Sequence, residues 1–288
     1  AGGGRWVGRV LLVLLVVGGA LVAESWTAMG RSPSDDDKAR FAGSPQFKDG
    51  RFKNRLQERM DYGKMMWKWL RGSDNREPEQ PPPVIVRTGA DFAEPPASGL
   101  RVTWLGHSTS LVEIDGARIL FDPVFGERSG PSRFVGPKRF HQPPLPFDEL
   151  PAVDAVVISH DHYDHLDYST IKGWVDADVR FVVPLGIGSH LRYWGVSADR
   201  VQELDWWSEV EAAGVRLVCT PARHFSGRSL TDKNKTLWAS WAIVGPRHRV
   251  YFSGDTAMFP EFAEIGERLG PFDVALMESG AYDATWAD

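Results

Sequence analysis

Short apolar segments at the spacing of buried strands fill the chain from residue 100 onward. Three of them come first, at residues 100–105, 110–115 and 117–122. Each alternates apolar with polar residues or is apolar throughout, as half-buried and buried strands are. The Asp115-Gly116 pair between the second and third segments is typical of a two-residue hairpin turn. We therefore expect three antiparallel strands joined in chain order.

Beyond these strands, strand patterns alternate with helical ones. We expect further strands at residues 154–159, 180–183, 201–204, 215–219, 238–244, 249–252 and 273–277. Short helices are expected at residues 168–175, within 184–195 and at 259–269. A sheet whose faces are covered by helices requires this alternation. The pattern predicts an α/β domain over residues 100–288.

The amino terminus has a different pattern, a charge-free apolar stretch at residues 10–23 that follows Arg5 and Arg9. This stretch is short for a membrane span and fits the apolar segment of a secretory signal. We expect residues 1–25 to be a signal peptide or membrane anchor, and the protein to be exported or membrane-anchored in a bacterial periplasm or envelope. Cleavage and retention both stay open, because Trp26 also suits a membrane interface. A buried core helix is the third interpretation.

Residues 26–99 form a lead-in with little regular pattern. Residues 31–38 are polar and are predicted to be flexible, and the triple proline within residues 81–84 predicts an extended segment. Apolar residues recur at helical spacing in residues 56–70, which predicts an amphipathic helix. Its methionines and tryptophans suit either an acyl-chain groove at a membrane surface or packing against the following domain.

Composition changes this picture little. The chain has 288 residues, of which 42% are hydrophobic, so it can bury a substantial core. Its net charge of −5 comes without a basic stripe, and we therefore expect no nucleic-acid partner. Cys219 is the single cysteine, so no internal disulfide can form. We expect it to be a buried apolar residue rather than a metal ligand.

Potential metal ligands are most concentrated in the sequence HDHYDH, which begins at His160 directly after an expected strand. In extended chain, residues two apart point the same way, so His160 and His162 can direct two ring nitrogens at one cation. If the chain bends after Tyr163, Asp164 and His165 can reach a second cation. They would offer one oxygen and one nitrogen ligand, a mixture that zinc accepts.

A polar surface turn with solvated histidines is the alternative interpretation of HDHYDH. Three of the chain's eight histidines fall within these six residues, which favours a metal site. His107 lies after the first strand but lacks ligand spacing to the cluster, so we expect a supporting or structural role for it. Asp122, which ends the third strand, is expected to orient the cluster from behind.

Two further motifs complete a recognisable set. HDHYDH fits the HxHxDH signature of the metallo-β-lactamase-fold hydrolases, and TPARH and FSGDT follow in the expected order. The chain therefore resembles this family. The resemblance implies a metallo-β-lactamase-like αβ/βα sandwich, an α/β fold of mixed sheets flanked by helices, incomplete at the carboxyl terminus.

The resemblance also implies a set of metal ligands for two zinc ions. His160, His162 and His224 would hold the first ion, Asp164 and His165 would hold the second, and Asp255 would bridge them. For Asp255, capping of the helix expected at residues 259–269 is the alternative.

Other motifs are similar to one branch of this family, the phospholipases D that hydrolyse N-acyl-phosphatidylethanolamine. These motifs are TWLGHST, FDPVF, PARHFSGR, LWASW and GPFD, and the similarity runs from about Ser44 to Asp288. In that branch, later chain supplies one more His ligand to the second zinc, whereas no His follows His248 here. We therefore expect a sequence clipped at both ends, whose second zinc site lacks one ligand.

The resemblance implies an activity as well. It is zinc-dependent cleavage of N-acyl-phosphatidylethanolamine-like phospholipids, at a membrane surface, to phosphatidic acid and N-acylethanolamine. Asp164 and Asp255 are the expected catalytic carboxylates and Tyr163 is the expected substrate contact. Manganese or iron would suit the same ligands. A lactonase or other soluble-substrate hydrolase and a non-catalytic, membrane-tethered zinc-binding module are the alternatives.

Overall fold

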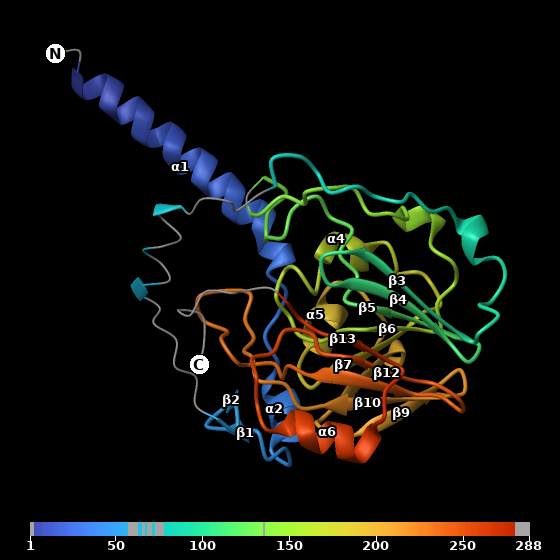
Figure 1. The fold of residues 1–288 in the computed structure, drawn as a ribbon. Helices are drawn as coiled ribbons and strands as arrows, with labels where there is room; N and C mark the ends of the chain where they lie inside the picture. Colours follow the sequence, from blue (N-terminus) through green and yellow to red (C-terminus); the bar gives the residue numbers. More distant parts are fainter. Residues whose placement is uncertain are drawn as a thin grey trace.

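Two β-sheets packed face to face form the centre of the protein (Figure 1). The computed structural model describes residues 3–56, 63–64, 67, 71–72, 78–134 and 136–279. The first sheet has the order β3-β4-β5-β6-β7-β8 and the second has the order β13-β12-β11-β10-β9. This is the two-sheet, helix-flanked α/β architecture that the sequence predicts.

The strands lie close to their expected positions. The first sheet contains β3 (Leu100–Gly106), β4 (Thr109–Ile114), β5 (Ala117–Phe121), β6 (Ala155–Val157), β7 (Arg180–Pro184) and β8 (Val201–Leu204). The second contains β9 (Glu209–Ala212), β10 (Val215–Thr220), β11 (Ser240–Val244), β12 (Arg249–Phe252) and β13 (Val274–Leu276). β9 was not predicted, because its alternating Glu209 and Glu211 leave few apolar residues to mark a strand.

Burial explains why the strands of the first sheet are apolar on both faces. Along β5, Ile119 and Phe121 enter the core between the two sheets, whereas Leu120 enters a second core on the outer face. β7 alternates in the same way, since Val182 faces the second sheet and Phe181 faces outward. The pleat sends successive side chains to opposite faces, so a sheet covered on both sides needs continuous apolar strands.

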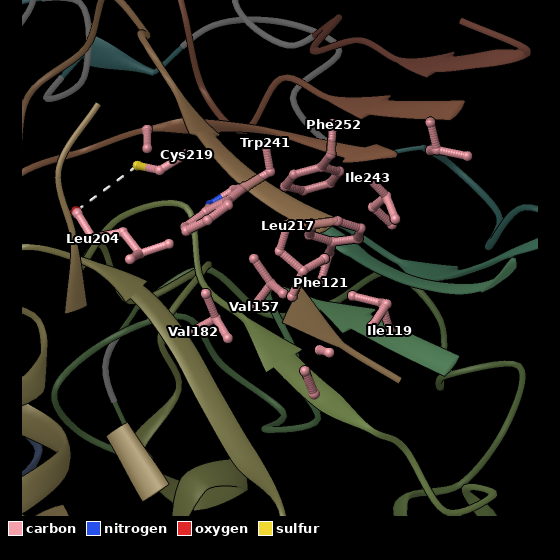
Figure 2. Close-up of a cluster of buried hydrophobic side chains, with 14 of the residues drawn as sticks. Ile119, Phe121, Val157, Val182, Leu204, Leu217, Cys219, Trp241, Ile243 and Phe252 are labelled. Atoms are coloured by element: carbon pink, nitrogen blue, oxygen red, sulfur yellow. Dashed lines mark hydrogen bonds between the residues drawn. The ribbon is translucent and has the colours of Figure 1, made fainter. Parts of the chain in front are cut away.

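Helices cover the outer faces of both sheets. α4 (Tyr168–Lys172) and α5 (Gly188–Tyr193) lie in the parallel crossovers of the first sheet, and α6 (Glu261–Leu269) packs on the second. Short 3-10 helices occupy Gly89–Phe92, Phe147–Glu149 and Ala198–Arg200. Figure 2 shows the inter-sheet core, in which Phe121 and Phe252 stack with ring centroids 4.5 Å apart.

Part of the lead-in is folded against this core. The expectation that residues 31–38 are flexible is wrong, because Ser34 and Asp37 form a reciprocal capping box that starts α2 (Asp35–Phe41). Phe41 and Phe52 are fully buried in the inter-sheet core, and Phe52 belongs to the small hairpin of β1 (Phe47–Lys48) and β2 (Arg51–Phe52). Most of the helix expected at residues 56–70 lies outside the described residues.

α1 (Gly3–Ala28) extends away from the body along most of its length (Figure 1). Within it, Arg9–Ala28 is long and apolar enough to cross a membrane, judged by length and composition. Only 6% of its most apolar part is buried, so α1 is not the core helix that was one of three interpretations. Burial begins near its last turn, where Ser25 and Ala28 pack against the body.

The ends of the two sheets are tied together by Asp115 in the turn between β4 and β5. Its carboxylate accepts the backbone N–H groups of Arg247 at 2.8 Å and His248 at 3.0 Å, and lies 2.7 Å from His248 Nδ1. Burial opposes ionisation, but these donors lower the pKa of Asp115 to about 2. The expected hairpin turn is thus confirmed, and its Asp also joins the sheets.

We expect Asp115→Asn to lower the free energy of unfolding at pH 7 by about 1–3 kcal/mol, the range for losing hydrogen bonds to a charged group. Because the folded pKa lies below the ordinary value, this contribution is present above about pH 4 and is lost as the pH falls toward 2. Urea unfolding should therefore show the two proteins converging over that interval. Exposed Asp178→Asn is the control, and a difference from wild type that stays constant between pH 4 and 2 would contradict this role.

Candidate metal centre

Three loops that follow strands meet at one edge of the two sheets. The HDHYDH loop (residues 160–165) follows β6, His224 follows β10, and Asp255 follows β12. The HDHYDH loop turns back on itself through hydrogen bonds from the backbone N–H groups of His165 and Leu166 to the carbonyl of His162. Asp167 then caps α4 by accepting from two backbone N–H groups. The local sequence therefore determines both the turn of this loop and the start of the helix that follows it.

A glycine allows the third of these loops to approach the first. Gly254 has φ +54°, and a Cβ on it would lie 2.6 Å from Cβ of Ser159. No larger residue fits there without moving the backbone. Asp255 consequently comes within reach of the histidines, and its alternative role is not seen, because the N-cap of α6 is Pro260.

His160, His162 and His224 form the first candidate group. His162 Nδ1 lies 2.9 Å from His160 Nε2 and 3.2 Å from His224 Nε2. One nitrogen from each of the three rings lies within 4.8 Å of the others. Tetrahedral zinc with bonds of about 2.0–2.1 Å needs ligand nitrogens about 3.3 Å apart, so these rings fit such an ion after small movements.

Asp255 joins this group to its neighbours. One carboxylate oxygen lies 3.1 Å from His165 Nε2, and the other lies 4.0 Å from His160 Nε2 and 3.8 Å from His224 Nε2. Asp164 Oδ2 is 4.0 Å from His165 Nε2. The geometry thus brings together all six residues that the sequence singled out, and the two oxygens of Asp255 face different histidines.

Burial and mutual charge give the donors the protonation that metal ligands require. Burial lowers the pKa of His160 and His162, and it lowers the pKa of His224 to about 3. These three rings are therefore neutral. For Asp255, burial opposes ionisation, but His165 and its neighbours lower the pKa to about 2. Neutral imidazoles beside an ionised carboxylate suit a divalent cation.

His165 differs from the other three rings. Burial opposes its charge, but Asp255, Asp164 and Asp122 raise its pKa well above the usual value. Asp122 is fully buried, and its Oδ2 lies 2.7 Å from His165 Nδ1. Ser159 donates its N–H and its hydroxyl to the same carboxylate at 2.6 and 2.5 Å. Asp122 therefore orients His165 from behind, as expected, and leaves Nε2 directed at the carboxylates.

His107 is the residue whose contact sequence reasoning missed. Its Nε2 lies 2.9 Å from Asp164 Oδ2, and it forms a further candidate group with Asp164 and His165. The residue has φ +47°, which directs the chain back after β3. The only sequence signal is its place at the end of a strand, since the contact crosses 57 residues of chain.

Tyr163 faces away from the carboxylates toward Arg228. Its hydroxyl donates to the carbonyl oxygen of Arg228 at 2.5 Å, and the guanidinium of the same residue lies 4.1 Å from its ring centroid. Burial raises the pKa of Tyr163 to about 12, so the hydroxyl stays protonated. Contact with a substrate stays a prediction, and it requires this hydrogen bond to be exchanged.

A cavity of about 670 Å³ opens beside the candidate centre. Asp164, His165 and Asp255 form its polar wall, while Trp104 and Phe252 are among its apolar residues. Cys219 is buried in the inter-sheet core with its sulfur 3.9 Å from the carbonyl of Leu204, as expected for an apolar residue. The arrangement can hold divalent cations at the base of a cavity that has both polar and apolar surface.

Comparison with known proteins supports the resemblance to the metallo-β-lactamase-fold hydrolases. Residues 117–288 match the family model of the beta-lactamase superfamily domain. An uncharacterized protein of Mycobacterium tuberculosis is 48% identical over 252 residues, which cover 85% of this chain and 67% of that protein. The N-acyl-phosphatidylethanolamine-hydrolyzing phospholipase D 1 of Caenorhabditis elegans is 40% identical over 224 residues, covering 74% of this chain and 62% of that enzyme.

A yeast relative and one solved structure extend the comparison. The mitochondrial N-acyl-phosphatidylethanolamine-hydrolyzing phospholipase D of Saccharomyces cerevisiae is 36% identical over 192 residues, covering 64% of this chain and 40% of that enzyme. Igni18, a metallo hydrolase from Ignicoccus hospitalis, has a TM-score of 0.50 and 25% identity, covering 65% of this chain and 73% of that one. The chain belongs to the beta-lactamase superfamily and is a metal-dependent hydrolase of the metallo-β-lactamase fold, with homologues among the N-acyl-phosphatidylethanolamine-hydrolyzing phospholipases D.

Proposed function

We propose that the protein is a zinc-dependent phosphodiesterase of phospholipase D type. Its substrate would be an N-acyl-phosphatidylethanolamine-like phospholipid, cleaved at the distal phosphodiester bond to phosphatidic acid and N-acylethanolamine. The observation that carries the proposal is the convergence of overlapping candidate groups of His and Asp residues, with Asp164, His165 and Asp255 in the wall of a partly apolar cavity. The printed activity of the worm and yeast relatives supports the choice of substrate.

In this proposal the candidate ligands hold two zinc ions. His160, His162 and His224 would hold the first, Asp164 and His165 would hold the second, and Asp255 would serve both. Bound zinc ions would make a water molecule more acidic and would neutralise charge on the phosphodiester. The second group also has His107 within its reach, which adds a nitrogen beside Asp164.

The chain's own residues would orient the reaction. Asp164 accepts a hydrogen bond from His107 or forms an ion pair with it at 2.9 Å, which fixes the carboxylate at the cavity wall. From there Asp164 can hold a metal ion and orient the attacking water, and no protein nucleophile is needed. Trp104 and Phe252 leave apolar surface for the lipid beside these polar groups.

The proposed location is a membrane surface. Arg9–Ala28 spans about 30 Å as a helix, which matches the hydrocarbon core of a bilayer. Its leucines and valines are exposed, and Trp26 is exposed near the end where the helix meets the body. A retained anchor in a bacterial envelope would therefore bring the cavity close to its phospholipid.

Added Zn²⁺ should stabilise the metal-free protein. Binding to the folded state alone contributes about 2.7 kcal/mol at a free concentration 100 times Kd, so the Tm should rise. His162→Ala removes the ring whose Nδ1 lies closest to both His160 Nε2 and His224 Nε2, and it should abolish most of this rise in Tm. His141→Ala, outside the candidate groups, is the control, and a Tm that does not respond to Zn²⁺, Mn²⁺ or Fe²⁺ would refute the metal site.

Asp164→Asn should lower kcat/KM for N-acyl-phosphatidylethanolamine vesicles by about 100-fold or more, because a neutral amide is a weaker metal ligand than a carboxylate and orients the attacking water less well. Product N-acylethanolamine can be followed by mass spectrometry. The control Asp148→Asn changes an exposed residue of the 3-10 helix Phe147–Glu149 and should leave kcat/KM unchanged. Turnover of lactones without turnover of the lipid would instead identify the protein as a soluble-substrate hydrolase.

Tyr163→Phe separates a substrate contact from a structural role. If Tyr163 contacts the phosphoryl group, kcat/KM should fall about 5–20-fold, because a hydrogen bond to a charged group contributes about 1.5–3 kcal/mol when fully formed and less when exchanged. The Tm should then change little. A lower Tm with unchanged kinetic constants would show that the hydroxyl only supports Arg228.

A further inference from the structure

Arg228 is a buried cation that the proposed chemistry does not use. Its guanidinium is surrounded by backbone carbonyls: Nε and one Nη donate to Ala28 O at 3.2 and 2.7 Å, and the other Nη donates to Asp161 O at 2.6 Å and Leu166 O at 2.8 Å. Among the described residues no carboxylate lies within ion-pair distance of it. The ring of Tyr163 lies on its face at 4.1 Å.

The carbonyls belong to two structures that are far apart in sequence. Ala28 is the last residue of α1, whereas Asp161 and Leu166 lie at the two ends of the HDHYDH loop. The last turn of α1 has no basic residue of its own, and Arg228 supplies positive charge at this negative end of the helix dipole. A single side chain therefore holds both the end of the apolar helix and the loop that carries four candidate ligands.

Two more side chains make the same connection. Trp194 Nε1 donates to Thr27 O at 2.7 Å, and its ring lies 5.1 Å from the Arg228 guanidinium. His190 Nδ1 accepts the backbone N–H of Arg31 at 3.0 Å, while its Nε2 lies 3.4 Å from Asp161 Oδ2. Gly30, which lies just beyond α1, packs tightly against His190, because a Cβ on Gly30 would lie 2.1 Å from His190 Nδ1.

Asp161 is the member of the HDHYDH loop that receives these contacts. It points away from the candidate ligands and accepts from Gly227 N at 2.7 Å and from the Thr236 hydroxyl at 2.8 Å. Movement at the end of α1 would therefore reach Asp161 along two routes, through Arg228 and through His190. Its neighbours in the chain, His160 and His162, would move with it.

We propose that Arg228 is a positioning residue that couples the end of the membrane-anchor helix to the HDHYDH loop. The proposal rests on the metal site and anchor of the proposed function. Packing of residues 27–31 against the body keeps the HDHYDH loop in the conformation that binds metal. The end of the anchor helix thus helps to position the candidate ligands. A change at this docking site should weaken metal binding although it touches no ligand.

The test uses the full chain in detergent micelles and a variant at the helix exit. Gly30→Ala should displace residues 27–31, because its Cβ would overlap His190 and its φ is +75°. Hydrogen exchange should increase at Met29 and Gly30 and also at His165 and Leu166, whose amides bond within each of the two segments. The dissociation constant for Zn²⁺, measured by titration calorimetry, should rise about 10-fold or more. Gly18→Ala, in the exposed part of α1 where a Cβ meets nothing, is the matched control.

Arg228→Lys tests the bridge itself, because lysine keeps the charge but cannot reach three carbonyls in a planar fork. It should reproduce both effects of Gly30→Ala, whereas Arg216→Lys, at an exposed position of the otherwise buried strand β10, should not. If Arg228→Lys does not fold, Trp194→Phe, which removes the bond to Thr27 O and leaves a smaller aromatic ring beside Arg228, takes its place with the same expected direction.

The coupling is refuted if exchange increases at residues 29–30 while residues 165–166 and the Zn²⁺ affinity stay as in the wild type. This outcome is distinct from failure of the proposed function. A wild-type chain that binds no Zn²⁺ would remove the metal site, yet the exchange of residues 165–166 in Gly30→Ala would still decide whether the helix end and the loop are coupled.

Discussion

Contacts between the two sheets occur within a few residues of the candidate ligands and of Asp122, which supports them. Phe121 of β5 stacks on Phe252 of β12, and the chain continues from these rings to Asp122 and to Asp255. Trp241 of β11 donates its Nε1–H to the carbonyl of Ile158 at 3.0 Å. These contacts fix the distance between the two sheets at the edge where the three loops meet. Because a packed core has few low-energy alternatives, the distances between ligands depend on it.

The centre also depends on layers of support behind the ligands. Asp122 and Ser159 hold His165 from the inter-sheet side, while Asp161 is held by Gly227, Thr236 and the groups that meet α1. Ring nitrogens that bind a cation cannot at the same time donate or accept hydrogen bonds that hold the rings in place. Rigidity is therefore supplied from outside the cluster, as is usual for metal sites.

The amino-terminal helix has two parts with different environments. Its apolar part is exposed and suits a bilayer, whereas its last turn packs on buried Arg228 and Trp194. Burial of a guanidinium is costly unless its donors are satisfied, and here the carbonyl of Ala28 in α1 accepts from two of them. The folded body and the end of α1 thus stabilise each other.

The sequence by itself determined the class of fold, most of the strands and the six candidate ligands. Strands that are buried on both faces leave continuous apolar segments, and the spacing of histidines in HDHYDH limits which of them can share a cation. Helix α2 was missed because its capping box lies in a run of polar residues that reads as flexible. Strand β9 was missed because its glutamates conceal the pattern.

Only the tertiary structure decided which groups support these ligands. His107 reaches Asp164 across 57 residues and Arg228 reaches Ala28 across 200, and no local pattern records such pairs. The tertiary structure also gives Tyr163, the expected substrate contact, a hydrogen bond to the backbone carbonyl of Arg228. The reason is physical: local sequence sets the direction of a side chain relative to its own strand or turn, but the packing of two sheets sets what lies opposite it.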